Sequence, residues 1–382
     1  MRVLMISKAC LVGIYQRKLE ELARFPGVEL TVVVPPSWRD HRGELRLERK
    51  HVQGYELVVE PVRLNGQYHL HYYPGLGRRF AQVRPEVVHI DEEPYSLVTW
   101  QCMRQARRAH APALFFSWQT LRKRYPPPFA WVEAYNLRHA AYGIAGNQTV
   151  ADVWRAKGYR GPLAVIPQFG VDPDLFSPAT AADRGRRTGR GFVVGYAGRL
   201  VEEKGVDVLL RALAGLPGAW QLVVVGDGPE RQALERLAAE LGIADRASFD
   251  AWIPSTEMAA FYRQLDALVL PSRTRAHWEE QFGRVLIEAM ASGTPVVAAR
   301  SGEIPRVVGD AGLLFPEDDH RALAAQLAQL MREAPRRADL ARRGRERVLA
   351  NYTQAQVARA TYAVYEEMLA KDGSRQWAIG SG

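Results

Sequence analysis

The feature that most constrains the fold is an alternation of short apolar runs with amphipathic stretches, which occurs twice along the 382 residues. The runs are rich in β-branched or aromatic side chains and have the length of strands buried in a parallel sheet. Strands that alternate with helices form right-handed βαβ units and a doubly wound sheet. In the first half the predicted strands are 3–6, 30–34, 87–90, 113–116, 142–145 and 163–166, with helices at 16–25, 96–110, 129–140 and 148–157.

A break in this alternation marks a domain boundary. After 168–173, the stretch 179–191 contains Gly, Arg, Thr and Asp without a hydrophobic period, which predicts an exposed connection. Alternation then restarts, with strands at 192–196, 221–225, 267–270 and 295–298 and helices at 206–213, 230–241, 255–264 and 283–291.

We therefore predict an α/β protein of two Rossmann-like doubly wound domains that face each other across a cleft. The N-terminal domain spans 1–167, a linker spans 168–191, and the C-terminal domain spans 192–350. The C-terminal helix over 351–370 is a candidate for packing back on the first domain, and 371–382 is expected to be a loose tail.

Composition restricts the class of protein. Hydrophobic residues make up 47% and charged residues 24% of the chain, which is ordinary for a globular protein. The two cysteines, Cys10 and Cys102, cannot form a disulfide framework or a four-ligand zinc site by themselves. No apolar run approaches the roughly 18 residues of a membrane helix. We expect a cytoplasmic protein that is a candidate for peripheral contact with the inner face of the membrane.

The positive charge is unevenly distributed. The net charge is +9, and residues 1–165 contain 24 Lys and Arg against 14 Asp and Glu, so the excess lies in the first half. Such asymmetry indicates an anionic partner (a membrane surface, a nucleic acid or a phosphorylated substrate) or simply a solvated basic surface. The basic-aromatic loop 121–129 is a candidate for contact with a membrane or acceptor, or a rigid connection.

The first chemical motif follows the first strand of the second domain. That strand ends in small residues, and Arg199 and Lys204 then lie five residues apart before a helix at Val206. Glycines such as Gly198 allow close backbone approach, and the helix N-terminus and the two cations favour an anion. This combination suits a diphosphate.

A second turn, 225–230, ends the next strand and contains Gly226. Ligand contact and a plain strand–helix turn explain it equally well. Neither domain has a G-x-G-x-x-G after its first strand, which weakens a dinucleotide-dependent oxidoreductase.

The most specific segment is 279–297. Gly283 opens an apolar helix in which Glu288 stands between Ile287 and Ala289, where a carboxylate is costly unless it is paired. From Gly283 to Glu288 is roughly 7–8 Å of helix rise. A phosphate on the backbone N–H groups of 283–285 would place a nucleoside ribose near Glu288, and Glu280 on the side of the transferred sugar. A buried Glu paired with an Arg is the structural alternative.

These segments resemble the retaining glycosyltransferases of family 4, of the "glycosyl transferases group 1" type, which have the GT-B fold. The resemblance rests on two Glu eight residues apart around a Phe-Gly helix start, preceded by Gly-Arg-Leu-x-x-x-Lys-Gly. It is dense over 192–315, where it includes 271–272, 293–296 and 302–305, and thinner over the first domain at 87–90 and 166–172.

The resemblance implies roles for matching residues. Arg199 and Lys204 would hold the diphosphate, Glu288 the ribose and Glu280 the donor sugar, with retention and without a metal or other cofactor. The co-substrate would be a UDP- or GDP-sugar. The full set of expected donor-binding residues is Gly13, Gly198, Arg199, Lys204, Gly226, Trp252, Ile253, Phe282, Gly283, Arg284, Val285 and Glu288.

The first domain departs from the family pattern. Many members have a His after a strand close to the reacting sugar, whereas 114–120 contains none here. Gln119 is therefore a candidate catalytic residue, and Trp118, His89 and Glu92 are acceptor-site candidates. An ordinary buried His and an exposed acidic loop at 91–93 are the alternatives. Gly13 replaces the usual Gly-Gly pair after the first strand, and Lys8 is a second candidate for facing the cleft.

Three functions compete at this stage. The favoured one is sugar transfer from a nucleoside-diphosphate donor to a glycan or lipid-linked hydroxyl acceptor. A GT-B sugar-nucleotide epimerase or phosphorylase is the enzymatic alternative. A basic nucleic-acid-binding protein is the non-enzyme alternative, against which the arginines are spread rather than striped and no stacking aromatic platform is visible.

Overall fold

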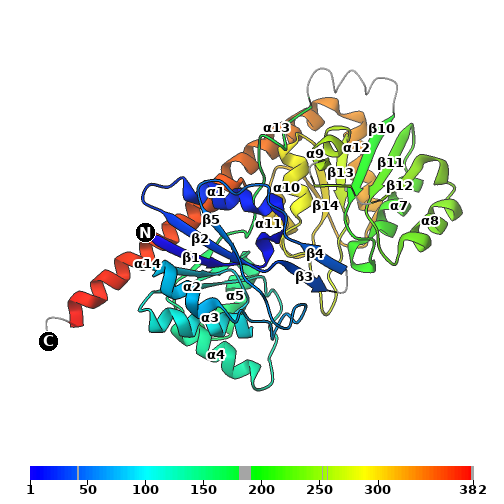
Figure 1. Cartoon of the computed structure of the whole chain (residues 1–382). Helices are drawn as coiled ribbons and strands as arrows, with labels where there is room; N and C mark the ends of the chain where they lie inside the picture. The colour runs from blue at the N-terminus through cyan, green and yellow to red at the C-terminus, as the bar shows by residue number, and fades with distance from the viewer. Residues whose placement is uncertain (41–42, 180–190, 252, 256, 380–382) are drawn as a thin grey trace. The chain divides into compact units, whose positions relative to one another are not determined.

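The computed structural model describes residues 1–379 except 41–42, 180–190, 252 and 256. The chain divides into two compact units (Figure 1). The N-terminal unit comprises Met1–Gly170 and Gln354–Gly382, and the C-terminal unit comprises Val171–Thr353. The unit boundary falls at Gly170, within the predicted linker, and most of that linker (180–190) lies outside the described residues.

The N-terminal unit contains a parallel sheet of order β5-β2-β1-β6-β7-β8-β9. Its strands are β1 (Arg2–Ile6), β2 (Glu29–Val34), β5 (Glu56–Val59), β6 (Val87–Ile90), β7 (Ala113–Ser117), β8 (Tyr142–Ala145) and β9 (Leu163–Val165). An antiparallel hairpin of β3 (Ser37–Asp40) and β4 (Gly43–Arg46) stands apart from it. Its α-helices are α1 (Arg17–Ala23), α2 (Leu76–Val83), α3 (Leu97–Arg108), α4 (Phe129–His139), α5 (Gln148–Ala156) and α14 (Gln354–Ile379).

Alternate residues of β1 show how helices cover both faces of this sheet. Val3 and Met5 belong to a core with side chains of α1 and α14, whereas Leu4 and Ile6 belong to a core with α2 and α3. Successive strand side chains point to opposite faces, so a strand covered on both sides is apolar throughout. This is why the central strands read as continuous hydrophobic runs.

The C-terminal helix α14 completes the N-terminal unit (Figure 1). Five of its side chains are buried in the core that also contains Leu19 and Leu22 of α1: Val357, Ala358, Val364, Tyr365 and Met368. The helix continues to Ile379, whereas the sequence predicts a loose tail from 371; residues 380–382 lie outside the described residues. Between 371 and 379 the sequence has one glycine and no proline to end a helix.

The C-terminal unit contains a parallel sheet of order β12-β11-β10-β13-β14-β15. Its strands are β10 (Phe192–Ala197), β11 (Trp220–Val225), β12 (Ala247–Asp250), β13 (Ala267–Leu270), β14 (Val296–Ala299) and β15 (Leu313–Phe315). Its α-helices are α7 (Val206–Ala214), α8 (Arg231–Glu240), α9 (Met258–Arg263), α10 (Arg284–Ala291), α11 (Ile304–Val308), α12 (His320–Arg332) and α13 (Ala334–Asn351). The expected Rossmann-like architecture is therefore present in both units.

The predicted strands agree with the structure to within one residue at each end, whereas the helices α2, α11, α12 and α13 were not predicted. The strands β5, β12 and β15 and the β3–β4 hairpin were not predicted. β12 alternates half-buried and exposed residues, because it lies at a sheet edge, and it lacks the apolar run that identifies a central strand. Among the described helices, none is long and apolar enough to cross a membrane.

Candidate functional site

The order of strands in the C-terminal unit locates a ligand site. The chain runs from β10 outward through β11 to β12 and then returns to the other side of β10 with β13. Ligands of doubly wound sheets bind where the strand order reverses in this way, at the carboxyl ends of the strands. Gly198 and Arg199 follow β10 at this edge, and Pro271 and Ser272 follow β13. The strand order therefore points to the same segments as the sequence motifs do.

Lys204 and Glu280 meet at this edge, although they are 76 residues apart in sequence. The Lys204 Nζ lies 2.5 Å from Oε2 of Glu280, and the Ser272 hydroxyl donates to the same oxygen at 2.9 Å. The ring of Trp278 lies beside the ammonium, with its centroid 4.7 Å from Nζ. Glu280 is only 8% exposed, so its charge is compensated by a cation and a hydroxyl rather than by water.

A glycine allows the two segments to approach. Gly205 caps α7 with φ +66°, and a Cβ there would lie 2.1 Å from the carbonyl oxygen of Pro271. Only glycine fits both the left-handed backbone and this contact. The start of α7 is thus pressed against the loop that leads to Glu280.

Glu288 lies inside α10, which Gly283 caps with φ +74°. Glu288 is 4% exposed, and both of its oxygens have partners: the Tyr262 hydroxyl donates to Oε2 at 2.8 Å, and the Arg284 Nε lies 2.9 Å from Oε1. Burial and the neighbouring Glu288 raise the pKa of Tyr262 well above its ordinary value, so the phenol keeps its proton and remains a donor. The pairing with an Arg is the structural alternative given above, and it leaves lone pairs on both oxygens for further donors.

The other donor-binding residues predicted in the C-terminal unit lie in the segments that follow β10, β11 and β12 and at the start of α10. The Arg199 side chain is exposed, with no ion pair to any other described residue, and its carbonyl accepts from the Tyr196 hydroxyl at 2.8 Å. Gly198 and Gly226 follow neighbouring strands, and Phe282 contacts Tyr352 with ring centroids 5.7 Å apart. Val285 and Ile253 are half-buried. Trp252 lies outside the described residues.

The N-terminal unit has its own reversal of strand order, between β1 and β6. Ser7 and Lys8 follow β1, and the acidic segment Asp91-Glu92-Glu93 follows β6. The Ser7 hydroxyl donates to Asp91 at 2.5 Å, and Lys8 is paired with Glu92. Asp91 and Glu92 are each 3% exposed, so the segment is a buried charged cluster rather than the exposed acidic loop of the alternative interpretation.

Two carboxyl groups of this cluster have opposite pKa shifts. Burial alone would raise the pKa of Glu92, but the Lys8 ammonium and the His71 ring together lower it to about 2. Burial raises the pKa of Glu93 to about 7, although it accepts hydrogen bonds from the Ser117 hydroxyl at 2.6 Å and the Trp118 N–H at 2.7 Å. At neutral pH Glu92 is therefore charged, whereas Glu93 is about half protonated.

The remaining candidates of the N-terminal unit lie around this cluster. The Trp118 indole donates to Gln168 at 2.8 Å, and Gln119 is 7% exposed and donates to the Leu121 carbonyl at 3.0 Å. Burial lowers the pKa of His89 to about 3, so its ring is neutral, and Nδ1 lies 2.7 Å from the Tyr365 hydroxyl.

Gly13 is covered by a neighbouring segment. Its N–H donates to the Glu48 carboxylate at 2.9 Å, and a Cβ would meet the Lys50 side chain at 2.7 Å.

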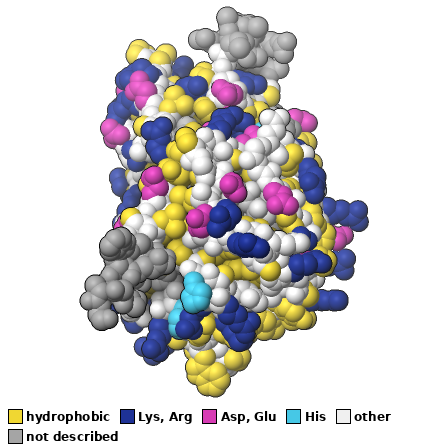
Figure 2. All heavy atoms as spheres, turned by 60° about the vertical axis from the view of Figure 1, so that its left-hand side comes forward, with side chains coloured by type: hydrophobic (Ala, Val, Ile, Leu, Met, Phe, Trp, Pro, Cys, Tyr) yellow, Lys and Arg dark blue, Asp and Glu magenta, His cyan; other side chains and the backbone are white. Residues whose placement is uncertain are grey.

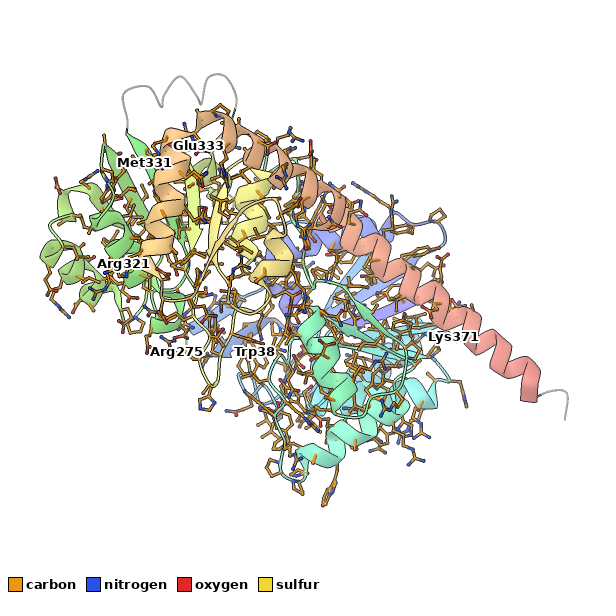
Figure 3. The ribbon with its side chains drawn as sticks, turned by 180° about the vertical axis from the view of Figure 1, so that it is seen from behind. Trp38, Arg275, Arg321, Met331, Glu333 and Lys371 are labelled. Carbon is orange, nitrogen blue, oxygen red and sulfur yellow. The ribbon has the colours of Figure 1, made fainter. Side chains whose placement is uncertain are left out.

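Sequence reasoning missed side chains that hold the site together. Tyr262 donates a hydrogen bond to Glu288, and the ring of Trp278 lies beside Lys204, the partner of Glu280. Arg273 links the loop after β13 to the segment before α7. Figure 3 shows the neighbouring Arg275 on that loop. No local pattern marks these residues, because the partners named here are at least 26 residues away in sequence. The one available signal was a buried Glu288, which requires a donor nearby.

The comparisons with known proteins agree with this geometry. Residues 181–347 match the family model described as "Glycosyl transferases group 1". Over 293 residues the chain is 32% identical to the 2-deoxystreptamine glucosyltransferase of Streptomyces kanamyceticus, covering 73% of this chain and 72% of that protein. Over 212 residues it is 39% identical to the D-inositol 3-phosphate glycosyltransferase of Stackebrandtia nassauensis, covering 51% of this chain and 46% of that protein. The chain thus spans about half the length of the latter relative.

The fold is shared with solved structures. The Anabaena protein Alr3699/HepE, crystallised in complex with UDP, superposes with a TM-score of 0.74 over 96% of this chain and 100% of that chain, at 19% identity. This likeness confirms the predicted fold class, GT-B, with two Rossmann-like α/β domains.

Proposed function

Because the chain belongs to the glycosyl transferases group 1 family, we propose that it transfers a sugar from a nucleoside-diphosphate donor, UDP- or GDP-linked, to a hydroxyl group of a glycan or lipid-linked acceptor. The observation that carries this proposal is the meeting of Lys204 and Glu280 at the point where the strand order of the C-terminal unit reverses. A cation there suits a diphosphate, and a carboxylate beside it suits sugar hydroxyls.

The residues divide the work by their chemistry. Lys204 and the exposed Arg199 hold the diphosphate and stabilise the negative charge that develops on it as it leaves. Glu280, held by Ser272, accepts hydrogen bonds from the donor sugar. Glu288 accepts hydrogen bonds from the ribose, since Tyr262 and Arg284 fix its orientation without using all its lone pairs.

The reaction breaks the bond between the anomeric carbon and the diphosphate oxygen and forms a bond from that carbon to the acceptor oxygen. The acceptor proton leaves with the diphosphate. We propose that the acceptor attacks from the face that the diphosphate vacates, so the configuration is retained. Cations and helix N-termini supply the charge stabilisation, so the reaction proceeds without a metal ion.

The N-terminal unit supplies the acceptor site in this proposal. Its buried cluster after β6 offers carboxylate acceptors for hydroxyl groups, and Trp118 and Gln119 lie beside it. On the face drawn in Figure 2, Lys and Arg side chains are interspersed with acidic and apolar ones. This distribution favours discrete polar contacts over the continuous basic stripe of a nucleic-acid-binding protein.

The first experiment is thermal unfolding against UDP, GDP, ADP and dTDP, with EDTA present. A ligand at 100 times its dissociation constant stabilises the folded protein by about 2.7 kcal/mol, a shift of a few degrees. We expect one nucleotide to stabilise the protein and to reduce the donor search to one base. Stabilisation by none of them would contradict the proposed function. Product analysis with the matching donor then distinguishes transfer from epimerisation, which needs no acceptor.

A further inference from the structure

Arg273 connects the two segments that carry the predicted diphosphate and sugar contacts. Its own N–H donates to the Glu203 carbonyl at 2.8 Å, and its Nη1 donates to the Glu202 carbonyl at 3.1 Å. Its Nη2 donates to Asp207 of α7 at 2.6 Å, and its Nε is paired with Asp318. Arg273 therefore holds the residues on both sides of Lys204.

This guanidinium is buried for a charged group. Arg273 is 7% exposed, and a buried charge is retained only where its hydrogen bonds are satisfied. The planar guanidinium reaches three partners in fixed directions, one backbone carbonyl and two carboxylates, which a lysine ammonium on a flexible stem does not reproduce. The loop that Arg273 occupies leads directly to Glu280, so one side chain fixes the distance between two parts of the site.

The neighbouring Arg275 differs from Arg273 both in its exposure and in its partners. Its side chain is 38% exposed and forms ion pairs with the exposed carboxylates of Glu202 and Asp318. Its other hydrogen bond goes to the Thr274 carbonyl on its own loop. Exposed pairs of this kind contribute little to stability. The contrast assigns the anchoring of the segment before α7 to Arg273.

We infer that Arg273 is a positioning residue that sets Lys204 against Glu280 and thereby tunes the site for a nucleoside diphosphate over a nucleoside monophosphate. This inference rests on the proposed function, since it assumes that Lys204 contacts the diphosphate. Arg273 itself has no contact with substrate in this account. Its effect on binding passes through Lys204.

The test compares Arg273→Met with Lys204→Ala, with the double variant, and with Arg273→Lys. Calorimetry measures the affinity for the diphosphate that stabilises the unaltered protein and for the matching monophosphate. We expect Arg273→Met to weaken diphosphate binding about tenfold or more, as loss of a hydrogen bond to a charged group does, with monophosphate binding unchanged within about twofold. Arg273→Lys should recover only part of the loss.

The matched control is Arg246→Met. Arg246 also donates to two backbone carbonyls, those of Trp220 at 3.3 Å and Gly218 at 2.6 Å, but at the amino end of β11. The substitution Arg246→Met should lower the free energy of unfolding without changing the ratio of diphosphate affinity to monophosphate affinity. A general loss of folding is thereby distinguished from a displaced Lys204.

The double variant decides the route of the effect. If Arg273 acts through Lys204, Arg273→Met adds nothing to the loss already caused by Lys204→Ala. Additive losses, or equal losses for the two nucleotides, would overturn the inference while leaving the proposed function intact. If Lys204→Ala binds the diphosphate as tightly as the unaltered protein does, Lys204 does not contact the diphosphate. That result would refute the role given to Lys204 under the proposed function, and with it the inference about Arg273.

Discussion

The substitution Glu288→Gln tests the nucleoside half of the site most directly. In the structure one oxygen of the carboxylate accepts a hydrogen bond from the Tyr262 hydroxyl, and the other is paired with the Arg284 guanidinium. Glutamine keeps the shape but must turn its oxygen toward Arg284, so its amide N–H₂ faces Tyr262, whose hydroxyl oxygen can then accept. The fold is preserved, and the charged acceptor for ribose hydroxyls is lost.

The magnitude follows from the hydrogen bonds involved. A hydrogen bond to a charged group contributes about 1.5–3 kcal/mol, so we expect nucleotide affinity to fall by roughly 10- to 150-fold. Stability should fall by about 1 kcal/mol, because the Tyr262 hydroxyl keeps one hydrogen bond, as an acceptor from the amide, while its own proton loses the carboxylate acceptor. Glu288→Ala is less informative, since it would leave the buried Tyr262 hydroxyl unpaired and destabilise the unit by about 1–3 kcal/mol for that reason alone.

The assay is calorimetric titration with the stabilising nucleotide and with its 2′-deoxy counterpart. The unaltered protein should bind the deoxy compound about tenfold more weakly, and Glu288→Gln should bind both alike. Tyr262→Phe is the control, because it perturbs the same buried cluster but keeps the carboxylate and hence the ribose preference. The reasoning is refuted if Glu288→Gln discriminates against the deoxy nucleotide as strongly as the unaltered protein does.

Three further perturbations test separate parts of the structure. Ser272→Ala removes the hydroxyl that holds Glu280, so steady-state kinetics should show turnover about 3- to 10-fold lower with donor affinity nearly unchanged. Burial raises the pKa of Glu93 from 4.5 to about 7, so the folded protein binds more protons than the unfolded chain between these pH values. The free energy of unfolding, measured with urea, should therefore fall by on the order of 2–3 kcal/mol as the pH rises from 4.5 to 7. Glu93→Gln should remove this dependence on pH. Gly226→Ala places a Cβ 1.9 Å from a carbonyl oxygen at φ +148° and should cost about 2–5 kcal/mol of stability, whereas Gly242→Ala, at φ +69° in open space, should cost about 1–2 kcal/mol; equal losses would contradict the packing argument.

The sequence predicted the central strands well and the sheet edges poorly. β6, β8 and β13 coincide with predicted strands residue for residue, because a strand covered by helices on both faces is buried along its length and largely apolar. β5 has a buried residue only at Val58, and β12 has none, so neither shows that signal. Pairing with the rest of the sheet, a non-local property, makes these segments strands.

The sequence named charged candidates for the site but not the side chains that contact them. The sequence identified Arg199, Lys204 and Glu280 as charges near helix starts and Glu288 as a carboxylate inside an apolar helix, and the structure brings Lys204 and Glu280 together. The groups that hold them come from remote segments, so their role appears only once the chain is folded. The segment Asp91-Glu92-Glu93 shows the same limit: its burial depends on Lys8 and Ser7, more than 80 residues earlier.

The return of α14 to the N-terminal unit has a consequence for biosynthesis. Five core side chains of that unit belong to the last helix, and Val171 and Thr353, the two ends of the C-terminal unit, are joined as bridge partners. The C-terminal unit is thus a continuous insertion whose own elements are all made before α14 emerges from the ribosome. The N-terminal unit is translated first, but its core remains incomplete until α14 is made, so an apolar face of β1 and α1 stays exposed during synthesis. This unit is therefore the one that needs protection from aggregation while the chain is being made.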